Sequence, residues 1–184
     1  MGRSGRVRRA WRIPCGPNTA ILRRIAREDV EVVRRFAETY EGDDVAAIVH
    51  DRMRGVDFAD PAALERLVAA WAAEDPMMRQ VHPEIEWDAS AGGMSGPARG
   101  FSELAAFYRD WMGLWESYVF RVVEYRDLGG WVVVPTDVWA RGRDGIAVEM
   151  RVFQIFRVRE GKVAVMRAFL SEEEALAAAQ QRPA

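Results

Sequence analysis

The segment from Gly129 to Leu170 constrains the fold of this chain more than any other stretch. It reads GGWVVVPTDVWARGRDGIAVEMRVFQIFRVREGKVAVMRAFL, in which β-branched and aromatic residues dominate and glycine-containing turns fall at Asp144-Gly145 and Glu160-Gly161. This pattern predicts three long antiparallel strands. A sheet of such long strands must curve, and the other elements have to pack against it.

The turn at Asp144-Gly145 determines which side chains share a face of this sheet. A two-residue turn there places Asp137 opposite Val152 and on the same face as Gln154. That face is otherwise apolar, and its full set is Val133, Pro135, Asp137, Trp139, Val148, Met150, Val152, Gln154 and Phe156. Burying a carboxylate and an amide costs free energy unless they find partners, so Asp137 and Gln154 become candidate functional residues.

The elements outside this segment predict a mixed fold. Apolar residues recur at helical spacing from Arg27 onward, and Asp60-Pro61 opens a later helix. From Glu84 to Asp88, polar and apolar residues alternate as they do in a strand. Ser102 opens another helix before the long strands. This order of helices and strands predicts an α+β fold, in which a cone-shaped, curved antiparallel sheet carries helices packed on its concave face. The apolar interior of such a cone is a natural site for a small molecule.

Composition favours a single domain. The chain has 184 residues, 49% of them hydrophobic, which suits one substantial core. We expect residues 1–27 to form a flexible basic segment and residues 28–180 to form the domain, with a helical insertion near 51–74. Two similar helix pairs precede the first strand, so the sequence leaves open which pair is the core pair. It also leaves open whether residues 51–74 form a lid or extra packing.

Charge and residue usage exclude several classes of partner. No apolar run reaches the roughly 18 residues that a membrane span needs, and the net charge of −2 gives no general attraction to nucleic acid. One cysteine, Cys15, and two histidines, His50 and His82, make a structural metal site unfavourable. We therefore expect a cytoplasmic protein with no metal, membrane or nucleic-acid partner.

Four stretches resemble the SnoaL-like branch of the NTF2-like, or ketosteroid isomerase-like, superfamily. They are EVVRRFAETYEGDDVAAIVH at 31–50, HPEIEWDAS at 82–90, GFSELAAFYRDWM at 100–112 and EMRVFQIFRVREGKVAVMRAFLSEEEAL at 149–176. The resemblance implies the cone-shaped α+β fold. It does not select one activity, because the superfamily includes isomerases, polyketide cyclases, epoxide hydrolases, dehydratases and non-catalytic association domains.

The resemblance to ketosteroid isomerases carries over at some positions only. It places Asp88 at the proton-shuttling aspartate and Gln154 at the acid that donates to the oxyanion, where an amide N–H can also donate. Phe36, or Val68 if the second helix pair is the core pair, stands in place of the oxyanion-hole tyrosine. Neither side chain can donate a hydrogen bond.

Two other enzyme types of the superfamily bear on Asp137. It aligns with a pocket aspartate of limonene epoxide hydrolase-like members, but Pro135 and Ala168 replace that set's arginine and second aspartate. The polyketide cyclases use one aspartate as acid and base without metal or cofactor, a role that the resemblance allows for Asp88 or Asp137. We accordingly expect no cofactor and name Asp88 and Asp137 as the candidate catalytic residues.

Structural roles compete with these catalytic roles. Asp88 could instead cap the turn that follows its strand. Asp137 could be held by Arg167, which would point inward after a two-residue turn at Glu160-Gly161; a three-residue loop would turn Met166 and Ala168 inward instead. The candidate ligand-binding residues are Gln154, Trp87, Trp139, Tyr108, Trp111, Trp115, Met150 and Val152. The four tryptophans among them are core residues by default, but in a hollow cone they would select a flat or aromatic ligand.

Two functions follow from these observations. The first is binding of a small apolar or polycyclic ligand in the cone, with cofactor-independent acid–base chemistry of the cyclase or isomerase type. The alternative is a non-catalytic homodimerisation module that uses the outer sheet face, where Phe153 and Ile155 lie among arginines. We expect a homodimer in either case.

Overall fold

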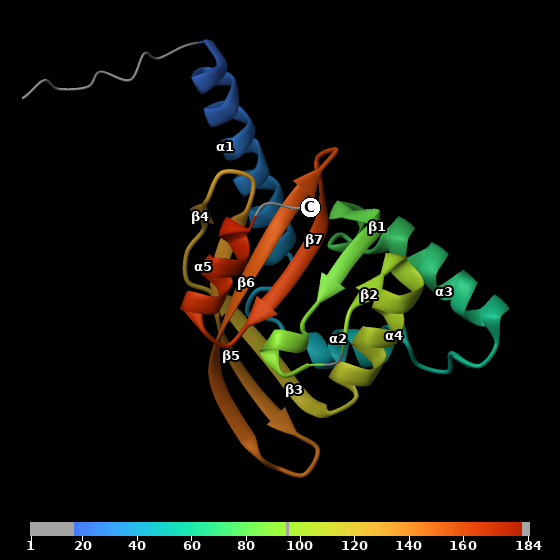
Figure 1. Cartoon of the computed structure of the whole chain (residues 1–184). Coiled ribbons are helices and arrows are strands. Elements are labelled where there is room, and N and C mark those ends of the chain that lie inside the picture. Colours follow the sequence, from blue (N-terminus) through green and yellow to red (C-terminus); the bar gives the residue numbers. More distant parts are fainter. Residues whose placement is uncertain (1–16, 95, 182–184) are drawn as a thin grey trace, which may run out of the picture.

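The computed structural model describes residues 17–94 and 96–181 and confirms the α+β prediction (Figure 1). Helix α1 (Pro17–Glu38) begins before the expected start at Arg27. Of the expected N-terminal segment, residues 17–27 therefore belong to α1, and residues 1–16 lie outside the described residues.

The sheet has strand order β2-β1-β7-β6-β5-β3, with β4 added beside β5. All pairs are antiparallel except β1 and β7, which run parallel. The strands are β1 (Val81–Asp88), β2 (Ala98–Arg99), β3 (Trp115–Val122), β4 (Arg126–Asp127), β5 (Val132–Gly142), β6 (Ala147–Arg159) and β7 (Lys162–Phe169). The three long strands predicted from Gly129 to Leu170 are β5, β6 and β7.

Helices cover the concave face, and one helix covers part of the opposite face. Helices α1, α2 (Val45–Arg52) and α4 (Gly100–Met112) contribute to the main core. Helix α5 (Glu172–Gln180) packs on the convex face of β6 and β7 (Figure 1). Its buried residues Ala175 and Ala179 form a second, smaller cluster with Trp131, Val133 and Ile155.

The first helix pair is the core pair. Val33, Phe36 and Ala46, from α1 and α2, are buried against the sheet. By contrast, Trp71 is the buried residue of α3 (Pro61–Glu74), and its ring packs against Tyr108 of α4 with centroids 5.8 Å apart. Helix α3 lies outside the core pair and adds a packing layer beside α4 and the short 3-10 helix η1 (Met78–Gln80). A second 3-10 helix, η2 (Ser90–Gly92), follows β1.

The β5–β6 connection differs from the predicted two-residue turn. Arg141 and Ala147 form the last pair of the two strands, so five residues, 142–146, lie between these partners, and the Ile146 N–H donates to the Asp144 carboxylate. The register consequently moves by one residue, and Asp137 lies opposite Arg151 instead of Val152. Because side chains alternate along a strand, the shift turns β5 over relative to β6. The predicted inward set on β5 was therefore wrong, and Thr136, Val138 and Ala140 face inward instead.

The β6–β7 turn has two residues, one of the two alternatives considered for it, but an irregularity follows it. Arg159 pairs with Lys162, and the register shifts between Arg157 and Val158. This shift points Met166 and Ala168 into the core, where both are buried. The Arg167 guanidinium lies instead near the Trp131 ring, 5.7 Å from its centroid. A bulge of this kind changes which face the following residues occupy.

No helix among the described residues has the length and apolar character needed to cross a membrane.

Candidate functional site

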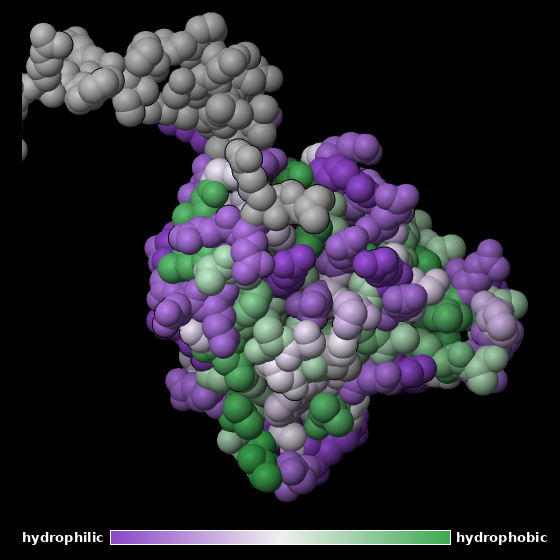
Figure 2. All heavy atoms as spheres, viewed as in Figure 1, coloured by the Kyte–Doolittle hydropathy of each residue, from purple (hydrophilic) through white to green (hydrophobic). Residues whose placement is uncertain are grey.

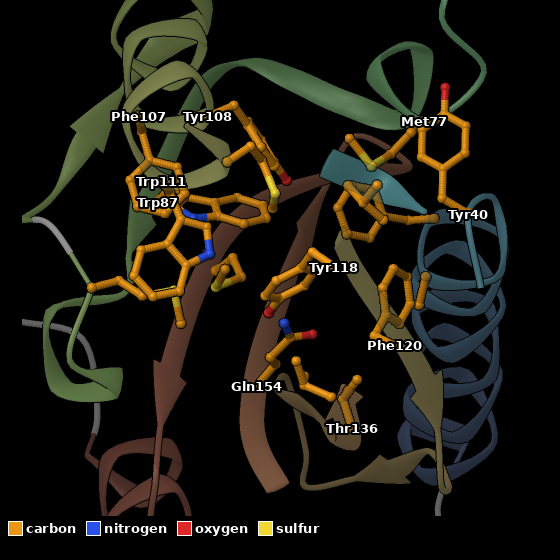
Figure 3. Close-up of a pocket in the computed structure, with 17 residues that line it drawn as sticks. Tyr40, Met77, Trp87, Phe107, Tyr108, Trp111, Tyr118, Phe120, Thr136 and Gln154 are labelled. Carbon is orange, nitrogen blue, oxygen red and sulfur yellow. The ribbon is translucent and has the colours of Figure 1, made fainter. Parts of the chain in front are cut away.

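A cavity of about 80 Å³ lies between the concave sheet face and helices α1 and α4 (Figure 3). Aromatic rings form much of its wall: Phe36, Trp87, Phe107, Tyr108, Trp111, Tyr118 and Phe120. Four methionines complete the apolar lining: Met77, Met94, Met112 and Met166. Polar side chains reach it at Tyr40, Thr136 and Gln154. The site is therefore an apolar chamber with a few hydrogen-bonding groups.

Helical and strand periodicity bring these residues together. In α4, the adjacent pairs Phe107-Tyr108 and Trp111-Met112 lie one helical turn apart and share one helix face. In the sheet, Thr136 and Val138 alternate inward along β5, and Gln154 does so on β6. Elements distant in sequence thus contribute to one wall.

The indole of Trp87 is held by three neighbouring rings. Its centroid lies 5.6 Å from that of Tyr108, 6.1 Å from that of Phe107 and 6.4 Å from that of Phe36. Edge-to-face and tilted contacts at such distances are favourable. The Trp87 ring is 6% exposed and has little freedom to turn.

The hydroxyl groups at the cavity remain protonated at neutral pH. Burial raises the pKa of Tyr118 to about 12, although a hydrogen bond with Trp111 opposes this effect. Burial also raises the pKa of Tyr108, and the nearby Tyr118 and Asp75 add to the effect. Both phenols therefore present O–H groups and cannot serve as bases near pH 7.

These tyrosines make the fold sensitive to alkali. An unfolded tyrosine ionises near 10.0, whereas burial raises the pKa of Tyr40 and of Tyr118 to about 12. Since the folded state holds these protons more tightly, this stabilisation is complete below pH 10 and is lost as the pH rises toward 12. Urea unfolding at neutral pH and at about pH 11 should show the loss, with tyrosinate absorbance rising in parallel. Equal stability at both values would contradict it.

A buried polar cluster lies beside the cavity at Asp75. Its Oδ1 accepts from the backbone N–H groups of Met77 at 2.8 Å and Met78 at 2.9 Å. Its Oδ2 accepts from the Tyr40 hydroxyl and from Arg52 at 3.0 Å. Asp75 is fully buried and joins α1, α2 and the end of α3. In the sequence, an Asp-Pro pair such as Asp75-Pro76 indicates only the end of a helix, so this role of Asp75 was not predicted.

The position predicted for Asp137, on the inner face of the cone, was wrong. Asp137 lies on the convex face, where Arg151 donates to it from Nε at 2.7 Å and from Nη2 at 3.0 Å. The hydrogen bond from Arg151 lowers the pKa of Asp137 below its ordinary value. This pairing follows from the one-residue register shift at the β5–β6 turn. A carboxylate with such a pKa, facing water, is a poor proton acceptor.

Asp88 also lies away from the cavity lining. Its Oδ1 accepts from the Ser90 N–H at 3.0 Å and from the Ser90 hydroxyl at 2.6 Å. These are the contacts of an aspartate that caps the turn after its strand, which was the alternative role considered above.

The predicted ligand-binding residues separate into two groups. Trp87, Tyr108, Trp111 and Gln154 line the cavity together. Trp139 lies on the convex face and is 39% exposed, because the register shift turns it outward. The remaining residues contribute to packing instead of lining: Trp115, Met150 and Val152.

Several residues that line the cavity were not predicted from the sequence. The two-residue turn expected at Asp144-Gly145 places Thr136 on the outer face, and Tyr118 stands in a strand pattern with no polar signal of its own. Four methionines scattered over 90 residues carried no pattern that could have identified them. Among the described residues, no group of His, Cys, Asp and Glu could hold a metal ion.

Comparisons with solved structures find related folds at low identity. TerC co-crystallised with polyporic acid is 18% identical, with a TM-score of 0.48, and the match covers 62% of this chain and 92% of that chain. A putative SnoaL-like polyketide cyclase from a Jannaschia species is 17% identical, with a TM-score of 0.45, covering 70% of this chain and 96% of that chain.

A third solved structure is a hypothetical protein with a ketosteroid isomerase-like fold from Catenulispora acidiphila, in complex with trimethylamine. It is 12% identical, with a TM-score of 0.47, and the match covers 67% of this chain and 98% of that chain. No curated protein matches the sequence significantly. The family model for the SnoaL-like domain matches residues 64–166, more than half of the 184 residues. The chain therefore belongs to the SnoaL-like domain family.

Proposed function

We propose that this protein binds a small, uncharged and largely apolar molecule in the cavity between the sheet and α4. The lining carries this proposal: among the described residues it contains aromatic, methionine and aliphatic side chains but no Asp, Glu, His, Lys or Arg. A buried charge without a partner costs much free energy, which disfavours ionic ligands. An apolar chamber with a few polar groups is the usual form of a small-molecule site.

The size of the cavity points to a compact ligand. Its volume of about 80 Å³ is roughly half of the 150 Å³ that accepts benzene in an engineered cavity. Methionine side chains are flexible and adapt to a ligand, and Met77, Met94 and Met166 line this site. A single ring therefore fits with modest rearrangement, whereas a polycyclic ligand requires a larger opening.

The positions of the predicted catalytic residues support binding more than acid–base chemistry. A general base has to reach its substrate within hydrogen-bonding distance. Asp137 faces the opposite side of the sheet, and Asp88 is occupied by Ser90. The cavity tyrosines are held protonated, so they can donate hydrogen bonds but not abstract protons near neutrality.

Calorimetric titration with toluene tests the proposal. Saturable binding is expected, and Ala37→Met, which adds a side chain to the cavity wall, should weaken it by at least about tenfold. Asp88→Asn and Asp137→Asn are the matched controls and should bind toluene as the native protein does, because neither residue lines the cavity. Absence of saturable binding to the native protein, or equal binding by Ala37→Met, would refute the proposal.

A second candidate function is self-association through the convex face. Helix α5 leaves the β3–β5–β6 end of this face uncovered, and there Val119, Trp139 and Glu149 lie side by side. Trp139 is 39% exposed beside the Arg151–Asp137 pair. Apolar and charged residues mix at the surface over this end of the β5–β6 hairpin (Figure 2). Such a patch suits an isologous dimer, in which each copy presents the same surface.

Trp139→Arg should abolish this association. Analytical ultracentrifugation over a concentration series is expected to show a dimer for the native chain and a monomer for the variant, because the new charge would be buried at the interface. Leu128→Arg is the matched control, since Leu128 has the same 39% exposure but lies at the β4–β5 turn. A native chain that stays monomeric at every concentration would rule out this function.

A further inference from the structure

The indole N–H of Trp87 is a buried hydrogen-bond donor that the fold leaves unused. Its Nε1 has no hydrogen-bond partner among the described residues, although the residue is only 6% exposed. Buried donors are almost always paired in folded proteins, because an unpaired one loses its bonds to water without replacement. A buried donor at the wall of a cavity therefore points to a partner that enters the cavity.

The position of Trp87 separates it from the other tryptophans. Trp71, Trp115 and Trp131 also have buried N–H groups without a partner, but none of these residues lines the cavity. Trp111 lines it, yet its side chain already hydrogen-bonds to Tyr118. Trp87 is thus the described tryptophan that combines an unused donor with the cavity wall.

The neighbours of Trp87 prevent its ring from turning the N–H elsewhere. Phe36, Phe107 and Tyr108 contact the indole from α1 and α4. A donor fixed before the ligand arrives loses little conformational freedom on binding. The arrangement suits recognition of an acceptor at one defined place.

Gln154 supplies a second donor from another wall. Its carboxamide lines the cavity on β6, while Trp87 lies on β1, and both side chains extend into the space between sheet and helices (Figure 3). No hydrogen bond to another described residue occupies the Gln154 carboxamide. The described lining contains no Lys or Arg, and Arg52 beside it is paired with Asp75. Two neutral donors in such a lining favour a neutral acceptor such as a carbonyl oxygen over a carboxylate, whose charge would remain uncompensated.

We propose that Trp87 selects the ligand by donating its Nε1–H to a neutral carbonyl oxygen on a molecule of about one ring, with Gln154 as the second donor. The inference rests on the proposed function of the cavity and specifies its ligand class. Trp87 would act as a specificity-determining residue: a molecule of the same shape without the oxygen leaves the buried N–H unpaired and binds less tightly.

The test compares acetophenone with α-methylstyrene, which replaces the carbonyl oxygen by a CH₂ group of similar shape. Calorimetry should show acetophenone binding about tenfold more tightly. In ¹H–¹⁵N spectra of the native protein, the Trp87 indole resonance, assigned by its absence in Trp87→Phe, should move downfield with acetophenone but not with α-methylstyrene. Benzoate, a charged analogue, should not bind.

Two variants complete the test. Trp87→Phe should reduce the affinity ratio of the two probes to about one, whereas Trp71→Phe should preserve it. Trp71 is a matched control because its buried N–H is also unpaired and its ring also packs on Tyr108. If Trp87→Phe is unstable, the Trp87 resonance is assigned by elimination from the single Trp→Phe variants of the other tryptophans, so the spectroscopic comparison on the native protein still decides the question.

The outcomes separate the inference from the proposed function. Equal binding of both probes with an unmoved Trp87 resonance would overturn the donor role and leave an apolar binding site standing. Failure of both probes to bind would overturn both proposals. Tighter binding of acetophenone with a shifted Trp87 resonance would establish the role of the indole N–H.

Discussion

Asp75→Ala is expected to lower the free energy of unfolding by about 3 kcal/mol, because it removes a buried acceptor on which several donors converge. The carboxylate accepts from Met77 N, Met78 N, the Tyr40 hydroxyl and Arg52. In the variant, the buried Met78 N–H and the part-buried Met77 N–H lose their acceptor, and Arg52 loses its ion-pair partner. Urea denaturation followed by tryptophan fluorescence measures the change.

Tyr40→Phe is the matched control for this prediction. It removes one donor to the same carboxylate, together with the 3.2 Å hydrogen bond that this hydroxyl accepts from Arg52, and should cost about 1 kcal/mol because both backbone donors and the Arg52 ion pair keep their acceptor. Because Tyr40 and Met77 line the cavity, Asp75→Ala should also weaken toluene binding, whereas Asp137→Asn should not. A loss of stability for Asp75→Ala no larger than that of Tyr40→Phe would show that the cluster does not hold the helix ends together.

Ile155→Arg is expected to destabilise the protein by about 4 kcal/mol or more, which approaches the largest effects seen for single substitutions. Ile155 is fully buried beneath α5, where it packs with Trp131, Val133, Ala175 and Ala179. An arginine there must either bury its charge without a partner or displace the helix. Thermal and urea unfolding, together with protease sensitivity of the C-terminal segment, report the effect.

Trp139→Arg serves as the surface control on the same sheet face. Trp139 is 39% exposed, so the substitution should change monomer stability by less than about 1 kcal/mol. The sequence predicted Ile155 to be exposed among arginines on the outer sheet face. That prediction was wrong, because α5 covers Ile155 and leaves it fully buried. Similar stabilities for the two variants would mean that α5 does not shield this part of the sheet in solution.

One connection decided whether the candidate site could be predicted. The strands on both sides of the Asp144-Gly145 turn were correctly expected, and so was the inward set on β6 that includes Gln154. The length of the connection was not correctly predicted, because the same Asp-Gly pair fits either two or five residues between the last paired residues of the strands. A difference of one residue in register moved Asp137 and Trp139 to the outside and Thr136 to the inside.

The sequence by itself determined the fold class and the family. Alternating apolar strands, helix caps and turn glycines are local signals, and a few of them suffice to specify an α+β fold with a curved sheet. The tertiary structure alone decided which side chains meet in the cavity, which aspartates lie outside it and where α5 packs. Those outcomes depend on register, on a bulge in β7 and on packing between distant segments, and none of these has a signature in the local sequence pattern.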